Sequence, residues 1–243
     1  MNRWEGENSA RGGPLHPGYA FPDAPLWRKF VFRASYSIST AAITLGFSLR
    51  TAGMHNMPLM GSALVVANHQ SYFDPVLVGI AARRELVYVA RKTLFRNRFF
   101  NALISAYNAV PIDQDGLGLD GIRTVFGQTQ LGRAVLIFPE GGRTLSGPME
   151  PFKPGIHLLI KKTQATIVPV GIAGAYEAWP CWRPYPIPAP LFLPARPGAI
   201  GVVIGDPVPA SHFTELPRDK SLADLFDRIA ALRDRAEKLR RHA

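Results

Sequence analysis

The sequence predicts an α/β fold in a single domain, with a mostly parallel mixed sheet flanked by helices. Short apolar runs rich in Val and Ile recur along the chain, and segments with helical periodicity lie between them, separated by turn signals. Such alternation is typical of βαβ units, in which successive strands run parallel. With 243 residues, of which 47% are hydrophobic, the chain is also long enough to bury a substantial core.

The N-terminal part divides into a tail and an amphipathic segment. Residues 1–25 contain no long apolar run, so we expect a flexible tail and no secretory signal. Residues 26–52 predict an amphipathic helical segment, and its most apolar part, residues 34–49, is shorter than the roughly 20 residues that a bilayer requires and is rich in Ser and Thr. Its apolar stripe consists of Trp27, Phe30, Val31, Ala34, Ile38, Ala41, Ala42, Leu45 and Leu49. Arg28, Lys29 and Arg33 gather at its start, which suits a helix that lies in a membrane interface near lipid phosphates. The alternative is a helix whose stripe packs on the protein's own core.

Five apolar runs are predicted strands. They are ALVVA at 63–67, ELVYVA at 85–90, AVLIF at 134–138, ATIVPVGI at 165–172 and AIGVVIG at 199–205. Helices are predicted between them near residues 74–82, 96–107, 119–131 and 154–162. Proline cannot donate to a strand ladder, so Pro169 predicts that the fourth run is an edge strand, a bulge or a bend.

We place the main domain at residues 53–215, which includes a proline-rich segment, and a C-terminal segment follows it. Residues 180–198 are rich in proline, which predicts an extended loop that either meets a lipid, lines an acyl groove or packs over a core edge. Its large side chains are Trp182, Tyr185, Leu191 and Phe192. Residues 216–243 predict a C-terminal docking helix with Ser221 and Asp224 as a capping box. Its apolar stripe is Leu222, Leu225, Phe226, Ile229 and Leu232.

Charge and cysteine content limit the possible functions. Lys+Arg 28 against Asp+Glu 18 gives a formal net charge of +10, which favours an anionic partner such as nucleic acid, acidic lipid headgroups or phosphorylated metabolites. The sequence has no recognised nucleic-acid-binding motif and does not interleave basic with stacking aromatic residues. The single cysteine, Cys181, excludes an internal disulfide and suits a reducing compartment. The six histidines show no ligand spacing, so we expect no metal.

A histidine and an aspartate stand five residues apart in NHQSYFDP, residues 68–75, directly after the first apolar run. If the chain turns sharply here, Asp74 accepts a hydrogen bond from one ring nitrogen of His69, and the other nitrogen can take a proton from a hydroxyl. Without a serine partner, the attacking hydroxyl would be the substrate's own. Such spacing also arises by chance, and Asn68 and Ser71 could equally be helix caps.

A second cluster, FPEGGRT at residues 138–144, follows the run AVLIF. Gly141 and Gly142 allow the backbone to approach a ligand, and the guanidinium of Arg143 suits a phosphate. Glu140 could orient a substrate or hold Arg143, and the alternative is a structural turn with a surface ion pair. Lys153, before a predicted helix start, could add a second positive charge toward the same anion.

Taken in order, NHQSYFD, VPIDQDG, FPEGGRT and IVPV resemble the four sequence blocks of the glycerolipid acyltransferase family, of the 1-acyl-glycerol-3-phosphate acyltransferase type. The likeness covers about residues 53–174. It implies a glycerol-3-phosphate acyltransferase-like fold and transfer of a fatty acyl group from acyl coenzyme A or acyl carrier protein to a hydroxyl of a lysophospholipid or glycerol phosphate. With 1-acyl-glycerol-3-phosphate as acceptor, the product would be phosphatidic acid, in phospholipid biosynthesis.

The resemblance also implies roles by position. His69 corresponds to the general base, Asp74 to its orienting partner and Arg143 to the phosphate ligand. The acceptor-binding and last blocks also contribute Glu140, Gly141 and Pro169. No cofactor is implied, because the acyl thioester is a co-substrate. The resemblance further implies a peripheral or monotopic protein on the cytoplasmic face of the membrane.

Two departures from the family pattern bear on the acceptor. Gln114 stands where the second block commonly has an arginine, so one phosphate contact is missing or is supplied by Lys153, Arg91 or Lys92. In the third block, Gly142 replaces a threonine and Thr144 a serine. Another lysophospholipid, a glycolipid or an aminolipid therefore stays open as acceptor. A basic nucleic-acid-binding protein and a non-catalytic lipid-binding relative are the alternatives from other classes.

Overall fold

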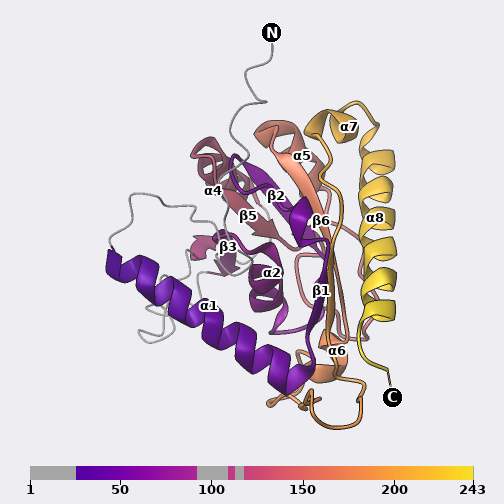
Figure 1. Cartoon of the computed structure of the whole chain (residues 1–243). Coiled ribbons are helices and arrows are strands. Elements are labelled where there is room, and N and C mark those ends of the chain that lie inside the picture. The colour runs from indigo at the N-terminus through magenta and orange to yellow at the C-terminus, as the bar shows by residue number, and fades with distance from the viewer. Residues whose placement is uncertain (1–25, 92–108, 113–117, 243) are drawn as a thin grey trace.

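A seven-stranded sheet forms the centre of the protein, whose structure is a computed structural model that describes residues 26–91, 109–112 and 118–242 (Figure 1). The strand order is β1-β7-β6-β2-β5-β3-β4, and every neighbouring pair is parallel except β6 with β7. The strands are β1 (Arg50–Ala52), β2 (Ala63–Ala67), β3 (Leu86–Arg91), β4 (Ala109–Ile112), β5 (Ala134–Ile137), β6 (Thr166–Ala173) and β7 (Gly201–Ile204). The predicted fold class, a mostly parallel mixed sheet flanked by helices, is confirmed.

Helices cover both faces of this sheet. They are α1 (Leu26–Phe47), α2 (Asp74–Ala82), α4 (Leu119–Gln130), α5 (Gly155–Thr163), α6 (Ala175–Ala178), α7 (Ala210–Thr214) and α8 (Arg218–Leu239), with a short 3₁₀ turn η1 (Met54–Asn56). Alternate residues of β2 face opposite cores, as the pleat requires. One core packs α1, α2 and α6 against the sheet, and the other packs α4, α5, α7 and α8. The helix predicted near residues 96–107 lies outside the described residues.

All five predicted strands are present, and two further strands were not predicted. β1 lies within the segment 26–52 that was predicted to be helical, so that prediction was wrong beyond Phe47. The helix ends because Ser48 takes a positive φ of 50° and its hydroxyl donates to the carbonyl of Ala189 at 2.7 Å. The apolar pattern did not predict β1 and β4, because both are short edge strands without a long apolar run.

Pro169 lies inside the sheet, which corrects one of the predicted alternatives, the edge strand, whereas the pairing next to it is interrupted as a bulge requires. β6 is an interior strand between β7 and β2, and Pro169 pairs with Val66 in the parallel ladder. The ladder with β7 begins only at Val170, and an isolated bridge joins Ile167 to Val208. A proline that lacks an N–H is tolerated between these two pairings, where its carbonyl still accepts the Gly205 N–H at 2.9 Å.

The C-terminal helix docks on the sheet as predicted. Its residues Leu225, Ile229 and Leu232 are buried, and α8 packs against β6 and β7. The predicted capping box was wrong, because the helix begins at Arg218, directly after Pro217. Proline has its φ already fixed and can lead directly into a helix. Ser221 therefore lies one turn inside, with its hydroxyl 3.1 Å from Nδ1 of His157.

The first helix turns most of its apolar stripe outward. α1 is held by Ile43 and Phe47, which are buried, and by the Tyr36 hydroxyl, which donates to the Ile80 carbonyl of α2. The stripe side chains Phe30 and Ile38 are 72% and 68% exposed. Packing of the stripe on the protein's own core is therefore wrong for this helix, although Leu49 beyond it is buried. Among the described residues, no helix has the length and hydropathy needed to cross a membrane.

Candidate active site

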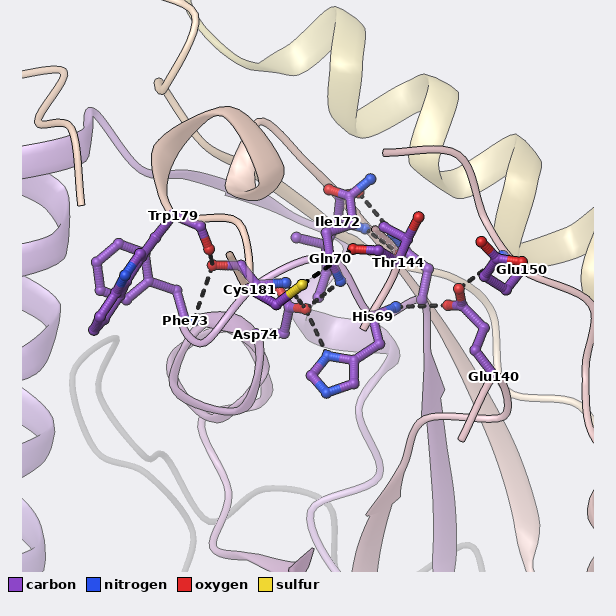
Figure 2. A network of polar contacts seen from close by, with 12 residues as sticks. His69, Gln70, Phe73, Asp74, Glu140, Thr144, Glu150, Ile172, Trp179 and Cys181 are labelled. Atoms are coloured by element: carbon purple, nitrogen blue, oxygen red, sulfur yellow. Dashed lines mark hydrogen bonds and ion pairs between the residues drawn. The ribbon is translucent and has the colours of Figure 1, made fainter. Parts of the chain in front are cut away.

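The turn between β2 and α2 brings His69 and Asp74 together. β2 ends at Ala67 and α2 begins at Asp74, whose Oδ2 lies 2.7 Å from Nδ1 of His69 (Figure 2). The same oxygen accepts the backbone N–H groups of Gln70 and Ser71 at 2.5 and 2.7 Å. The sharp turn that the five-residue spacing required is thus present, and three donors fix the position of one carboxylate oxygen.

The environment of the pair orients the histidine as a base. Asp74 is fully buried, the His69 side chain is 16% exposed, and its ring stacks on Phe138 with centroids 3.9 Å apart. Because a carboxylate only accepts hydrogen bonds, Nδ1 of the neutral ring carries the proton and Nε2 carries the lone pair. Nε2 has no hydrogen-bond partner among the described residues. This arrangement is suited to taking a proton from a bound hydroxyl.

The FPEGGRT segment holds the main chain of His69 from both sides. The Glu140 carboxylate accepts the His69 N–H through Oε1 at 2.7 Å, and the Thr144 N–H donates to the His69 carbonyl at 3.0 Å. The second oxygen, Oε2, accepts the Glu150 N–H at 2.8 Å. Glu140 therefore positions the turn between β2 and α2, and an ion pair with Arg143 is not among its contacts. No sequence pattern pointed to this contact of Thr144.

Burial changes the acidity of Glu140. Loss of hydration raises the pKa of its carboxyl to about 7, and the negative charges of Asp74 and Glu150 add to the rise. The hydrogen bonds from the His69 and Glu150 amides act in the opposite direction. The carboxyl that anchors His69 therefore titrates close to neutral pH.

Two basic side chains lie on the same group of loops. The Arg143 Cζ lies 3.8 Å from the ring centroid of Tyr72, a residue of the turn between β2 and α2. The Lys153 stem packs over Gly141, which has a φ of 76°, and a Cβ at Gly141 would come within 3.3 Å of Lys153 Cγ. Glycine at position 141 thus serves both the backbone conformation and this close packing. Nothing in the structure explains the glycine at position 142.

Other predicted site residues have structural partners. Asn68 is fully buried, and its carboxamide bonds both the N–H and the carbonyl of Ile172 in β6. The Ser71 hydroxyl donates to the Trp179 carbonyl at 2.7 Å and accepts the Phe73 N–H. Neither residue is the N-cap of α2, and both hold the turn without facing an open site. Pro169 is buried in the sheet, and Gln114, Lys92 and the side chain of Arg91 lie outside the described residues.

Together, the fold and the site define a class of enzyme. Two loops that follow neighbouring parallel strands, β2 and β5, meet at the edge of the sheet that the carboxyl ends of these strands form. This is where α/β proteins commonly bind substrates. A histidine oriented by a buried aspartate stands there without a protein nucleophile hydrogen-bonded to it among the described residues. Such a site is suited to activating a hydroxyl of a substrate. A family model described as Acyltransferase matches residues 48–173, just over half of the chain, and the chain belongs to this acyltransferase family.

Named relatives and a solved structure agree with this family. A 1-acyl-sn-glycerol-3-phosphate acyltransferase from Bacillus subtilis is 24% identical over 202 residues, which cover 81% of this chain and 94% of that one. A protein of the same name from Streptococcus pneumoniae is 29% identical over 46% of this chain and 41% of its own. The crystal structure of the 1-acyl-sn-glycerophosphate (LPA) acyltransferase PlsC from Thermotoga maritima superposes with a TM-score of 0.72 at 23% identity. It covers 90% of this chain and 85% of that one, and the likeness establishes the fold.

Proposed function

We propose that the protein transfers a fatty acyl group from acyl coenzyme A or acyl carrier protein to the hydroxyl of 1-acyl-glycerol-3-phosphate, giving phosphatidic acid. The observation that carries the proposal is the 2.7 Å contact between His69 Nδ1 and Asp74 Oδ2, with Nε2 left for the substrate. The names of the relatives support this choice of acceptor.

The proposed reaction uses His69 as a proton shuttle. Nε2 takes the proton of the acceptor hydroxyl while its oxygen attacks the thioester carbonyl, and Asp74 stabilises the imidazolium that forms. The tetrahedral intermediate then breaks its C–S bond, and the leaving thiolate takes the proton from Nε2. An ester and a free thiol result, so the reaction balances without a cofactor.

Arg143 is the proposed phosphate ligand. Its guanidinium lies over the Tyr72 ring, and a guanidinium held against an aromatic ring still presents N–H donors, two of which a phosphate can accept. Lys153 lies over the same loop and supplies a second positive charge. Because Gln114 stands where an arginine is usual, another lysophospholipid, a glycolipid or an aminolipid is the second candidate acceptor.

Product formation from acyl coenzyme A with different acceptors tests the proposal. We expect lysophosphatidic acid to be preferred over lysophosphatidylcholine and glycerol 3-phosphate, and Arg143→Ala to raise its KM. Arg123→Ala is a matched control, because Arg123 lies exposed on α4 and pairs with Asp120. Equal use of an acceptor without a phosphomonoester, or an unchanged KM in Arg143→Ala, would contradict the proposed acceptor.

Membrane attachment is the second part of this proposal. The outward apolar stripe of α1, with Phe30 and Ile38 at its centre, would lie in the interface of an anionic bilayer on the cytoplasmic face. Anionic lipid also accounts for the +10 charge without a nucleic-acid partner. Acceptor and product would then stay in the membrane throughout the reaction.

A further inference from the structure

The proline-rich segment 180–198 has no regular secondary structure, but its backbone is fixed. The N–H groups of Ala189 and Leu191 donate to the carbonyls of Gly46 and Leu45 at the end of α1, both at 2.9 Å. From the end of α8, Arg241 donates to the carbonyls of Leu191 and Leu193. Arg240 also donates to the carbonyl of Pro197. Two helices therefore hold the segment in one conformation.

This fixed backbone presents large apolar side chains to solvent. Tyr185 and Phe192 are each 78% exposed and Trp182 is 60% exposed, with Ile187, Leu191 and Leu193 each at least 40% exposed. Contiguous exposed apolar side chains on a monomer commonly mark an interaction surface. Trp and Tyr are enriched where a bilayer meets water, because their rings are apolar and their polar atoms can still reach water.

Two arginines accompany these side chains. Arg183 stacks on Trp182 with its Cζ 4.8 Å from the ring centroid. Arg196 is exposed, and its guanidinium makes no hydrogen bond or ion pair in the described part of the chain. Together with Trp182 and Ile187 they line a hollow of about 420 Å³. Cations beside exposed aromatic rings match a surface where lipid phosphates lie just above the acyl chains.

The sheet topology places this segment beside α1 and the active site. β1 runs antiparallel to β2 and β6, so the end of α1, the segment 180–198 and the turn that carries His69 all lie at the same edge of the sheet. Figure 1 shows the segment beside the C-terminal end of α1. The Tyr72 hydroxyl of the catalytic turn also donates to the Cys181 carbonyl at 3.2 Å.

We propose that segment 180–198 is a second membrane-docking element, which binds the surface of an anionic phospholipid bilayer next to α1. This inference rests on the proposed membrane attachment. Two docking elements at one edge fix the orientation of the protein as well as its distance from the bilayer. The contact between Tyr72 and Cys181 then links the bound segment to the turn that carries His69, where the acceptor hydroxyl must arrive.

Vesicle sedimentation tests the proposal with two triple variants. The first carries Trp182→Ser, Tyr185→Ser and Phe192→Ser. The control carries Leu59→Ser, Met60→Ser and Leu131→Ser, which replace equally exposed side chains before β2 and β5, at the opposite edge of the sheet. On phosphatidylcholine vesicles with phosphatidylglycerol, we expect the first variant to lose binding roughly tenfold or more and the control less than about twofold.

A second pair of changes tests the cationic part. Arg183→Gln with Arg196→Gln should reduce the preference for phosphatidylglycerol vesicles over pure phosphatidylcholine vesicles and weaken the salt dependence of binding. Lysine at both positions should restore the preference. Retention of the full preference by the glutamine variant would overturn the role of these arginines.

The remaining outcomes separate this inference from the proposed reaction. Acyl transfer to detergent-dispersed acceptor should be unchanged in the serine variant of segment 180–198, since none of its three residues is part of the site. Wild-type binding by this variant would overturn the docking element. Self-association of the wild type, abolished by the variant while vesicle binding stays unchanged, would assign the surface to a second copy and also overturn it. Complete absence of vesicle binding in the wild type would refute membrane attachment and leave the detergent assay of acyl transfer standing.

Discussion

His69 is fixed at three of its atoms, by Asp74 at the start of α2 and by two residues of the FPEGGRT segment. Asp74 orients the ring nitrogen Nδ1, Glu140 accepts the N–H, and the Thr144 N–H donates to the carbonyl. The ring contact could be predicted from a five-residue spacing because it is local. The Glu140 contact spans 71 residues, and it depends on the pairing of β2 with β5, which no local pattern reveals.

Asp74→Asn tests the negative charge beside the base. The Gln70 and Ser71 N–H groups keep the asparagine oxygen facing Nδ1, so the ring stays oriented, but the charge that stabilises the imidazolium is lost. We expect kcat to fall roughly 10²- to 10⁴-fold with little change in the KM of the acceptor. Asp120→Asn on the exposed surface of α4 serves as the control. A kcat within a factor of two of the wild type would contradict the role of Asp74.

Glu140→Gln tests the buried carboxyl through the pH dependence of stability. The pKa of Glu140 is about 7 in the folded protein against an ordinary value of 4.5, so the unfolded chain loses this proton first as the pH rises. The bound proton therefore stabilises the folded protein fully below pH 4.5, and this contribution to the unfolding free energy is lost as the pH rises through 7. Relative to Glu140→Gln, the wild type should lose about 3 kcal/mol of unfolding free energy over this range.

Denaturant titrations of the two proteins at several pH values measure this difference. Parallel stability curves for wild type and Glu140→Gln from pH 4.5 to 8 would show that the carboxyl of Glu140 is not held in a low-dielectric environment.

Among the secondary-structure elements, apolar runs predicted the buried strands well, and short or interrupted elements poorly. β2, β5 and β6 lie in the interior of the sheet and read as continuous Val- and Ile-rich runs. β1, with the sequence RTA, has no such run and exists because β7 provides a partner. The edge-strand alternative for Pro169 was wrong because the tolerance of this proline depends on where the β7 ladder begins, and that is a property of the assembled sheet.

Docking of α8 on β6 requires a glycine at position 171. A Cβ at Gly171 would lie 2.2 Å from both the Arg233 nitrogen and the Leu232 carbonyl carbon of α8, and neither backbone atom can move without shifting the helix. Gly171→Ala should therefore lower the unfolding free energy by about 3 kcal/mol. Gly127→Ala in α4 meets no atom within 4 Å and should raise it by about 0.5–1 kcal/mol. Equal effects of the two changes would refute this close packing.

The outward stripe of α1 makes a separate prediction. Ile38→Asp places a charge at the centre of the exposed stripe and should reduce sedimentation with anionic vesicles roughly tenfold, since it removes apolar contact and adds repulsion. Leu131→Asp, at an equally exposed position before β5, is the control. If both aspartate variants bind vesicles as the wild type does, α1 does not contact the bilayer.

At the scale of the whole molecule, the sheet gathers everything needed for the proposed reaction at one edge. The loops after β2 and β5 carry His69 and Arg143, and the end of α1 and segment 180–198 lie at the same edge. The hydroxyl of an acceptor that remains in a bilayer docked at this edge could thus approach Nε2 of His69. The fold class and the order of the sequence blocks were predictable from the sequence, whereas this common placement depends on the mixed direction of β6 and β7.

The most direct test of this account is thiol release from long-chain acyl coenzyme A by the purified protein, with and without detergent-dispersed lysophosphatidic acid, beside His69→Ala. In the wild type, thiol release should depend on lysophosphatidic acid. Because His69 is the proposed general base, release should fall roughly 10²- to 10⁴-fold in His69→Ala, while the melting temperature of the variant stays that of the wild type. Equal acceptor-dependent release by wild type and His69→Ala would contradict the proposed catalytic role of the His69–Asp74 pair.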